Sequence, residues 1–389
     1  MSADARRYSL PRWRITRWLA DPGADVPRDI RIALVSSLYG TLPIFFGGVF
    51  NTILVALLIT LRQPHPSFMG WLALEIALCV TRLAVLLHAQ RAADAGRRTP
   101  TDIYLLLSVC WAASVGYGTF ISLMSGDWVS ATLACLSAAA MVGGICFRNY
   151  SAPRLAGTMI VLSLGACCLA APFTGEWLMV AALVQIPFYL YAMSMASYQL
   201  NKMLITTMQG EREYAYRAVH DTLTGLSNRA GLMRAMEAKW ALPATGQDGF
   251  SLLYLDLDGF KAVNDTQGHH GGDRLLTMVA GRLSGLARAG DVTARIGGDE
   301  FVVLSLTTDR AQIGAFAQRL IHDIAQPYEN GASVGVSIGI ALSREHPASF
   351  DAVLQAADEA LYRAKADGKL CYRIAAPARP APEPALRRA

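Results

Sequence analysis

The chain has 389 residues, which is long enough for two or more domains. It is 53% hydrophobic and only 17% charged, whereas soluble domains carry about a quarter charged residues, so part of it is expected to lie in lipid. The net charge of +5 arises entirely from residues 1–199, which hold 14 arginines, no lysine and 9 acidic residues. The second half is formally neutral, which argues against nucleic acid as a partner.

The first half contains long apolar segments. Runs without Asp, Glu, Lys or Arg cover residues 32–61, 103–126, 128–147, 155–175 and 177–201. A sixth segment, residues 69–88, is apolar apart from Glu75 and Arg82. Each segment supplies roughly the 20 apolar residues that cross a bilayer as a helix. We therefore expect a six-span membrane domain over residues 32–199, and the first run is too long for a cleaved signal-peptide core.

Arginines are divided unevenly between the expected loops. Six spans place both termini on one side, together with the loops near residues 89–102 and 148–154. That side carries Arg6, Arg7, Arg12, Arg14, Arg17, Arg28, Arg31, Arg91, Arg97, Arg98, Arg148 and Arg154. The opposite loops carry only Arg62. The positive-inside rule therefore predicts a multi-pass protein of a bacterial-type cytoplasmic (inner) membrane, with the basic N-terminus (residues 1–31) and the C-terminal half in the cytoplasm.

Two charged residues interrupt the second span. Glu75 and Arg82 are seven positions apart and therefore share one face of a helix. One interpretation is a polar, ligand-sensing site inside the bundle. The interpretation that we favour is that Arg82 extends to the cytoplasmic interface while Glu75 pairs within the bundle. A transporter is disfavoured because the spans show no internal repeat.

The second half alternates strand and helix patterns. Residues 200–217 predict a signalling helix that links the two halves. The patterns that follow predict strands at 251–256, 292–296, 301–306 and 334–341, helices at 271–287 and 350–366, and a disordered tail at 375–389. The second and third strands flank Gly297 and Gly298, which is typical of a hairpin. The expected fold is an α+β domain with a mostly antiparallel sheet.

Acidic residues follow the first strand and the hairpin turn. Asp256 and Asp258 end the strand, and Asp299 and Glu300 follow the two glycines. Carboxylates in such an arrangement suit Mg²⁺, which binds a few carboxylates together with phosphate oxygens. Two such ions would stabilise an in-line phosphoryl displacement. Gly297 and Gly298 leave room for a phosphate against the backbone.

Five motifs occur in a fixed order along residues 218–374. They are DTLTGLSNR at 221–229, DLDGFKAVND at 256–265, GH at 268–269 with GD at 272–273, RIGGDEF at 295–301 and ADEALYRAK at 357–365. Together they resemble the GGDEF domain, the catalytic domain of diguanylate cyclases, which has a palm-like, nucleotide-cyclase-like fold. The membrane half resembles no sensor family in the same way.

The resemblance implies a nucleotidyltransferase, a diguanylate cyclase that condenses two GTP into cyclic di-GMP and two pyrophosphates across a homodimer. It implies metal ligation by Asp256, the Leu257 carbonyl and Asp299, with Mg²⁺ as the cofactor and Mn²⁺ as an alternative. Asp299 or Glu300 would assist deprotonation of the 3′-hydroxyl. The implied substrate-binding residues are Phe260, Lys261, Asn264, His269, Asp273, Gly297, Gly298, Lys365 and Lys369.

Asn264 and Asp273 would recognise guanine. A carboxylate such as that of Asp273 can accept two hydrogen bonds from guanine, one from N1–H and one from the 2-amino group, and adenine lacks this pair of donors.

Two further positions bear on activity. Lys369 and Leu370 stand where resembling sequences usually have arginine and asparagine, which predicts a weaker hold on the triphosphate because lysine lacks the bidentate fork. Arg288 and Asp291 match the family's product-inhibition site in form and in their offset to Gly297. The alternative for this pair is a surface ion pair worth under about 1 kcal/mol.

A hypothesis of a different class is a catalytically silent receptor that binds GTP or cyclic di-GMP and is coupled to a membrane sensor. Replacement of the acidic residues at the hairpin turn would favour this receptor hypothesis, but both of them, Asp299 and Glu300, are present.

Overall fold

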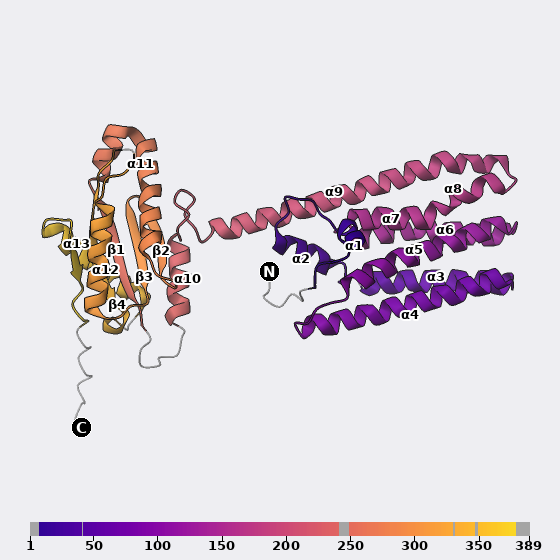
Figure 1. Ribbon diagram of the computed structural model, residues 1–389, viewed down its shortest axis with the longest axis horizontal. Coiled ribbons are helices and arrows are strands. Elements are labelled where there is room, and N and C mark those ends of the chain that lie inside the picture. The colour runs from indigo at the N-terminus through magenta and orange to yellow at the C-terminus, as the bar shows by residue number, and fades with distance from the viewer. Residues whose placement is uncertain (1–7, 41, 241–248, 330, 347–348, 379–389) are drawn as a thin grey trace, which may run out of the picture. The chain divides into compact units, whose positions relative to one another are not determined.

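The computed structural model describes residues 8–40, 42–240, 249–329, 331–346 and 349–378 (Figure 1). The predictions made for residues 1–7 and 379–389 lie outside these ranges. The chain divides into two compact units, Met1–Gly210 and Glu211–Ala389. Each unit is described by itself below.

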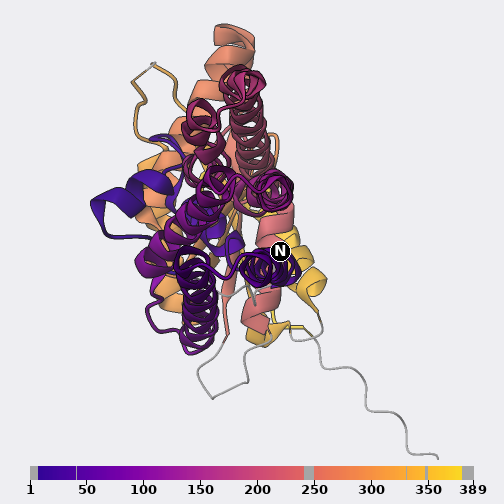
Figure 2. The ribbon, with the colours of Figure 1, turned by 90° about the vertical axis from the view of Figure 1, so that its right-hand side faces the viewer.

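The first unit is helical, and Figure 2 views its long helices nearly end-on. Its elements are α1 (Arg14–Leu19), α2 (Arg28–Ser37), α3 (Leu42–Arg62), α4 (Pro66–Asp94), α5 (Thr101–Met124), α6 (Trp128–Asn149), α7 (Pro153–Leu164), α8 (Ala166–Ala170), η1 (Ala171–Phe173), η2 (Trp177–Ala181) and α9 (Ala182–Arg217).

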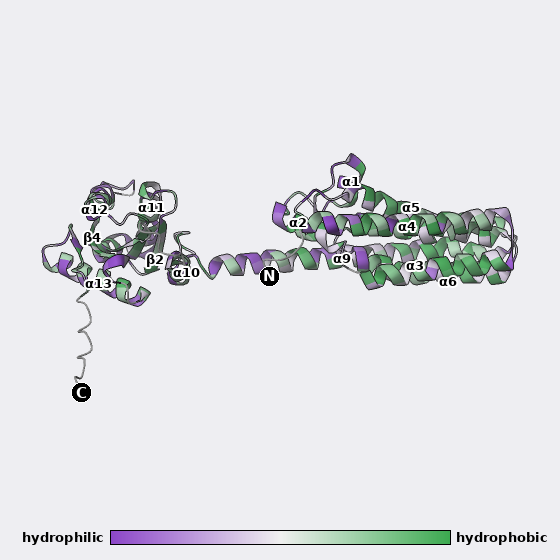
Figure 3. Cartoon of the chain, turned by 90° about the horizontal axis from the view of Figure 1, so that it is seen from below, coloured by the Kyte–Doolittle hydropathy of each residue, from purple (hydrophilic) through white to green (hydrophobic). Residues whose placement is uncertain are grey.

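Six helical segments among the described residues are long and apolar enough to cross a membrane, as predicted. Apolar residues dominate them in Figure 3. The fifth, Pro153–Phe173, comprises α7, α8 and η1, and the sixth, Trp177–Arg217, comprises η2 and α9. The helix predicted at 200–217 is therefore the end of α9 rather than a separate element.

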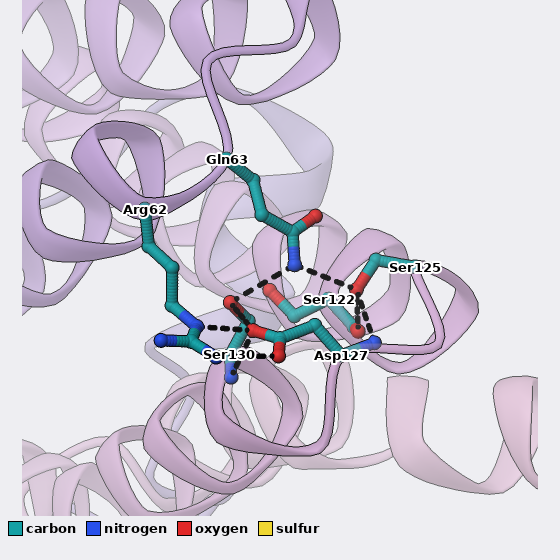
Figure 4. Close-up of polar contacts among 6 residues, drawn as sticks. All are labelled: Arg62, Gln63, Ser122, Ser125, Asp127 and Ser130. Carbon is teal, nitrogen blue, oxygen red and sulfur yellow. Dashed lines mark hydrogen bonds and ion pairs between the residues drawn. The ribbon is translucent and has the colours of Figure 1, made fainter.

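A polar network joins the α3–α4 and α5–α6 connections at one end of the bundle (Figure 4). Arg62 donates from Nε and Nη2 to the two carboxylate oxygens of Asp127, at 2.7 and 2.9 Å. Asp127 also caps α6 by accepting from the backbone N–H of Ser130 at 3.1 Å, and Gln63 donates to the Ser130 hydroxyl at 3.2 Å. This end therefore holds the loops that were predicted to carry few basic residues.

The N-terminal segment packs at the other end of the bundle, against the start of α5. The carboxylate of Asp102 accepts from the backbone N–H groups of Arg12 and Trp13, at 2.8 and 3.0 Å. Arg154, at the start of α7, forms an ion pair with Asp21 at 3.1 Å. These contacts place the basic N-terminal segment with the α4–α5 and α6–α7 connections, as the distribution of arginine predicts.

Arg82 is buried between helices. The Arg82 residue is only 3% exposed, and its guanidinium lies 4.5 Å from the Trp111 ring centroid and 5.2 Å from that of Phe45. Helix α4 continues to Asp94, twelve residues or about 18 Å further along the helix axis. The extension of Arg82 to the cytoplasmic interface stays a prediction. Glu75 does pair within the bundle, where it accepts from the Ser114 hydroxyl at 2.7 Å.

The second unit is a five-stranded sheet covered by helices on both faces (Figures 1 and 3). The strand order is β2-β3-β1-β4-β5, with every pair antiparallel except β4 and β5. The elements are α10 (Arg229–Trp240), β1 (Ser251–Asp258), α11 (Phe260–Leu286), β2 (Val292–Gly297), β3 (Glu300–Ser305), α12 (Arg310–Ile324), β4 (Gly335–Leu342), η3 (Ser343–Glu345), α13 (Phe350–Ala366) and β5 (Tyr372–Ile374).

Alternation along the central strand β1 fills two separate cores. Leu253 and Leu255 pack with α11 and α12, whereas Leu252 and Tyr254 pack with α10 and α13. All four side chains are 9% exposed or less, so both faces of β1 are buried. The strand is thereby fixed in the middle of the domain. Its last residues, Asp256 to Asp258, lie where this central strand ends.

The helix expected over residues 271–287 corresponds to the part of α11 after Gly268, whose φ of 71° and ψ of 173° break the helix. The part of α11 before this kink, which starts at Phe260, was not predicted. One predicted boundary in this unit is wrong. The predicted disorder does not hold for the first residues of the tail. Ala375 is 3% exposed and donates its backbone N–H to the Ile340 carbonyl at 2.7 Å, which extends the pairing beside β4.

Candidate active site

The end of β1 and the tip of the β2–β3 hairpin lie side by side. Asp256 is the register partner of Glu300, and the backbone N–H of Leu257 donates to the Asp299 carbonyl at 3.3 Å. The tip turns at Gly298, whose φ of +47° favours glycine. The structure thus brings Asp256 to Asp299 and Glu300, which follow it by more than 40 positions in the sequence.

An arginine holds the hairpin tip in place. Arg295 donates from Nε and Nη2 to the carbonyl of Gly298, at 3.0 and 2.8 Å, and from Nη1 to Asp221 at 3.1 Å. Burial alone would raise the pKa of Asp221, but hydrogen bonds from Thr224 and Arg295 outweigh it and lower that pKa. Asp221 and Arg295 both lie in motifs of the sequence. Their positioning role could not be predicted, because the two residues are 74 positions apart and only the fold brings them into contact.

The carboxylates at the strand end are difficult to ionise together. Burial raises the pKa of Asp256 even though the Lys365 ammonium lies 2.7 Å from its Oδ2. Burial also raises the pKa of Glu300, and the negative charge of Asp256 adds to this effect. The site therefore concentrates negative charge that a cation would stabilise.

A small set of oxygen donors lies at this site. Within the ranges that the structure describes, no three His, Cys, Asp or Glu side chains gather closely enough to hold an ion by themselves. Asp256 and Asp299 with the Leu257 carbonyl are instead a small oxygen donor set. Mg²⁺ commonly uses one or two carboxylates together with substrate phosphates, so this set suits it.

The first turns of α11 carry several predicted substrate residues. Phe260 packs partly buried against the core, Lys261 is exposed, and Asn264 is half-buried. A Cβ placed on Gly272 would lie 2.0 Å from the Asn264 Oδ1, so a larger residue here would displace the Asn264 side chain. Asn264 and Asp273 therefore sit on turns that pack closely across the kink at Gly268.

A cavity of about 680 Å³ lies beside α11. Of the three residues Asn264, His269 and Asp273, only Asp273 is among those that line it. His270, adjacent to His269, also lines this cavity. The remaining lining residues, which the sequence did not single out as binding residues, are Leu223, Arg274, Thr277, Met278 and Glu329.

The turn after α13 contains both departures from the family pattern. Lys365 lies in the last turn of α13 and contacts Asp256, whereas Lys369 is exposed. Lys369 and Leu370 both have a left-handed backbone, with φ of 67° and 51°. The backbone N–H of Leu370 donates to Asp258 at 3.2 Å, which ties the turn to the end of β1.

Arg288 and Asp291 meet through the backbone and not through an ion pair. The Asp291 carboxylate accepts from the backbone N–H groups of Arg288, at 2.9 Å, and of Leu306, at 3.2 Å. Among the described residues no carboxylate pairs with the guanidinium of Arg288, which is exposed. The surface ion pair considered as the alternative is therefore wrong, and Asp291 instead stabilises the turn that presents Arg288.

Comparison with known proteins agrees with this geometry. Residues 218–371 match the family described as diguanylate cyclase, GGDEF domain. This segment is a GGDEF domain. It covers all the residues discussed above, from Asp221 to Leu370.

Curated relatives share the GGDEF domain. The bifunctional diguanylate cyclase/cyclic di-GMP phosphodiesterase MucR of Pseudomonas aeruginosa is 40% identical over 167 residues, which are 42% of this chain and 24% of MucR. The diguanylate cyclase DgcP of Escherichia coli is 31% identical over 219 residues, 55% of this chain and 63% of DgcP. The chain spans 20% to 24% of the length of MucR and two uncharacterised relatives.

Solved structures also match. The GGDEF domain of TpbB from Pseudomonas aeruginosa is 35% identical, covers 40% of this chain and 94% of its own, and has a TM-score of 0.38. The GGDEF domain of DgcB from Caulobacter crescentus, solved in complex with c-di-GMP, is 30% identical, with 40% and 93% coverage and a TM-score of 0.36.

Proposed function

We propose that the chain is a membrane-anchored diguanylate cyclase that converts two GTP molecules into cyclic di-GMP and two pyrophosphates. The observation that carries this proposal is the juxtaposition of Asp299 and Glu300 with Asp256, held by the Leu257–Asp299 hydrogen bond and the Arg295 clamp. The match of residues 218–371 to the GGDEF family and the cyclase names of its relatives support it.

Each half-reaction joins the 3′-oxygen of one GTP to the α-phosphorus of the other. The bond from the α-phosphorus to the bridging oxygen breaks, and pyrophosphate leaves with that electron pair. The hydroxyl proton passes to a carboxylate of the hairpin. Glu300 suits this role because its raised pKa makes it a better proton acceptor than an ordinary glutamate.

Asp256, Asp299 and the Leu257 carbonyl would hold Mg²⁺, or Mn²⁺ in its place. The ion supplies charge stabilisation for the phosphates during displacement. Lys365 and Lys369 would contact phosphate oxygens, and Lys261, near the start of α11, would add a third cation. Gly297 and Gly298 allow a phosphate to approach the backbone of the tip.

Guanine would be read in the cavity beside α11. The Asp273 carboxylate lines this cavity and can accept from N1–H and the 2-amino group. Asn264 lies one close turn away and would contact the base from the other side of the kink. His269 would border the nucleotide, together with the neighbouring His270 that lines the cavity.

The reaction needs two nucleotides in opposed active sites, so we propose a homodimer as the active species. We further propose that the product inhibits the enzyme by binding Arg288. The exposed guanidinium has no carboxylate partner among the described residues, and the turn that Asp291 fixes presents it to solvent. A guanine or a phosphate oxygen can accept from such a fork.

The first test is turnover. Detergent-solubilised full-length protein is incubated with GTP and Mg²⁺, and cyclic di-GMP and pyrophosphate are separated by chromatography. We expect product from the wild type and a loss of at least about 100-fold in Asp299→Ala, because a metal ligand is removed. Asp351→Asn, which changes an exposed carboxylate in the first turn of α13, is the matched control and should retain activity.

Appreciable turnover in Asp299→Ala would remove the metal assignment. Absence of product from the wild type, with GTP or cyclic di-GMP still binding, would replace the enzyme with the silent nucleotide receptor.

The second test concerns inhibition. In Arg288→Ala we expect cyclic di-GMP to inhibit at least about tenfold less strongly while initial turnover stays near wild type, since a charge-assisted contact is lost outside the reacting centre. Initial rates are measured against added product. Arg319→Ala, on the surface of α12, is the control. Unchanged inhibition in Arg288→Ala would show that this arginine takes no part in product binding.

A further inference from the structure

The first unit contains a small internal cavity that the proposed catalysis does not use. Its volume is about 50 Å³, enough for a few water-sized groups. It lies between α3, α4, α5 and α6, and the residues that matter here are Phe45, Arg82, Trp111, Gly144, Ile145 and Arg148.

Arg82 is a buried cation without a polar partner. The residue is 3% exposed, and its Nε is buried without a hydrogen-bond acceptor in the described part of the chain. The rings of Trp111 and Phe45, at 4.5 and 5.2 Å, offer cation–π contacts. Such contacts do not satisfy the N–H groups of the guanidinium. A ring face attracts the positive charge, but it cannot accept the five directed hydrogen bonds that a guanidinium can donate.

A second arginine lies at the same cavity. The Arg148 guanidinium is 5.0 Å from the Phe45 ring centroid and donates to the Tyr104 hydroxyl. Arg148 is 7% exposed, so two like charges face one aromatic ring in a dry environment. Repulsion between them is strong where the local dielectric is low.

The nearby carboxylate attracts Arg82 but lies outside the cavity. Glu75 lies two turns from Arg82 on α4, accepts from Ser114 at 2.7 Å, and does not line the cavity. The walls therefore offer cationic donors together with apolar groups and no anionic side chain.

We propose that this cavity binds a small, singly charged oxyanion of the size of formate, acetate or nitrate. A planar oxyanion can accept in parallel from the guanidinium fork of Arg82. The volume excludes larger solutes, and the apolar wall formed by Ile145 and its neighbours accommodates a hydrogen or methyl group. Small oxyanions would then be the ligands of the first unit.

The test measures binding to the detergent-solubilised full chain. Sodium formate, acetate and nitrate are titrated against a constant sodium gluconate background, since gluconate is too large for the cavity, and heat and unfolding temperature are recorded. We expect saturable binding of at least one small anion. Arg82→Gln should weaken it at least about tenfold, as expected for the loss of charge-assisted hydrogen bonds. Arg91→Gln, an exposed arginine on the same helix, should not.

A second pair of variants keeps both arginines. Gly144 lines the cavity and Gly143 does not, and a Cβ added at either position meets nothing within 4 Å. Gly144→Val should therefore reduce anion affinity at least about tenfold while Gly143→Val leaves it unchanged. Equal affinity in both valine variants, or no saturable binding to the wild type, would overturn the proposal. Co-purification of a tightly held anionic phospholipid that only Arg82→Gln releases would also overturn it in favour of a lipid phosphate.

Discussion

Three consecutive residues after α13 have a positive φ, and two of them are not glycine. Gly368 adopts φ 111° without strain, but Lys369 and Leu370 follow at 67° and 51°. A bulky side chain in this region costs about 1–3 kcal/mol. Hydrogen bonds from the backbone N–H groups of Lys369 to Ala364 and of Leu370 to Asp258 hold the turn in this conformation. Asparagine, which resembling sequences usually have in place of Leu370, tolerates the left-handed region better.

We expect Leu370→Asn to stabilise the second unit by about 1 kcal/mol, because the native backbone is kept and the side-chain strain falls. This corresponds to a rise of roughly 2–4 °C in the unfolding temperature measured by calorimetry. Leu306→Asn, at an exposed leucine with an ordinary backbone, is the control and should give no increase. A decrease in Leu370→Asn would mean that packing of Leu370 over Gly335 outweighs the strain.

At the scale of the elements, the last residues of β1 and the first residue of β3 include carboxylates that are costly to ionise. Burial raises the pKa values of both Asp256 and Glu300 in the folded protein. For each group the stabilising contribution is fully present below the pKa of the unfolded chain, near 4, and is lost as pH rises through the higher folded pKa. The metal-free site therefore weakens the domain increasingly toward neutral pH.

Glu300→Gln removes one of these groups at every pH. We expect the unfolding temperature of the metal-free variant to equal or fall slightly below that of wild type near pH 4 and to exceed it near pH 7.5. Glu359→Gln, at an exposed position on α13, provides a matched change whose effect should not vary in this way. If the difference in unfolding temperature between Glu300→Gln and wild type stayed constant from pH 4 to pH 7.5, the raised pKa of Glu300 would be contradicted.

The sequence predicted the elements whose pattern is local. The run at 251–256, the glycine pair at 297–298 and the helical spacing over 350–366 correspond to β1, the hairpin tip and α13. It missed the first half of α11 because Gly259, Gly268 and the glycines at 271–272 suggest loops, although Gly268 alone leaves the helical conformation. The Arg295–Asp221 clamp could not be predicted from spacing, since the fold alone brings these residues together.

At the scale of the whole molecule, six apolar helical segments alternate their connections between two ends of the first unit. One end holds the arginine-rich loops and the N-terminal segment, and the other holds Arg62 with Asp127. Arginine counts predicted this division well. They could not reveal that Arg82 is buried between helices, because its position depends on how α4 packs against Phe45 and Trp111.

Reporter fusions test the orientation that we propose, with the arginine-rich end in the cytoplasm. Fusions after Gly96 and Gly126 place a reporter in successive connections. We expect a fluorescent protein to fold after Gly96 and after the last residue, and alkaline phosphatase to be active only after Gly126, because Arg91, Arg97 and Arg98 retain their loop inside. The reverse pattern would invert the topology and place the GGDEF domain where GTP is absent.

The ion pair between Lys365 and Asp256 has a consequence for how the site fills. With its ammonium 2.7 Å from Oδ2, Lys365 acts as a tethered counterion for the strand-end carboxylate. Lys365 would leave Asp256 free to hold a divalent ion and would then meet a phosphate oxygen. Because the same lysine serves both, whatever help the metal gives to nucleotide binding, the nucleotide gives equally to metal binding. When product leaves, the return of Lys365 to Asp256 would restore the resting site without any change in fold.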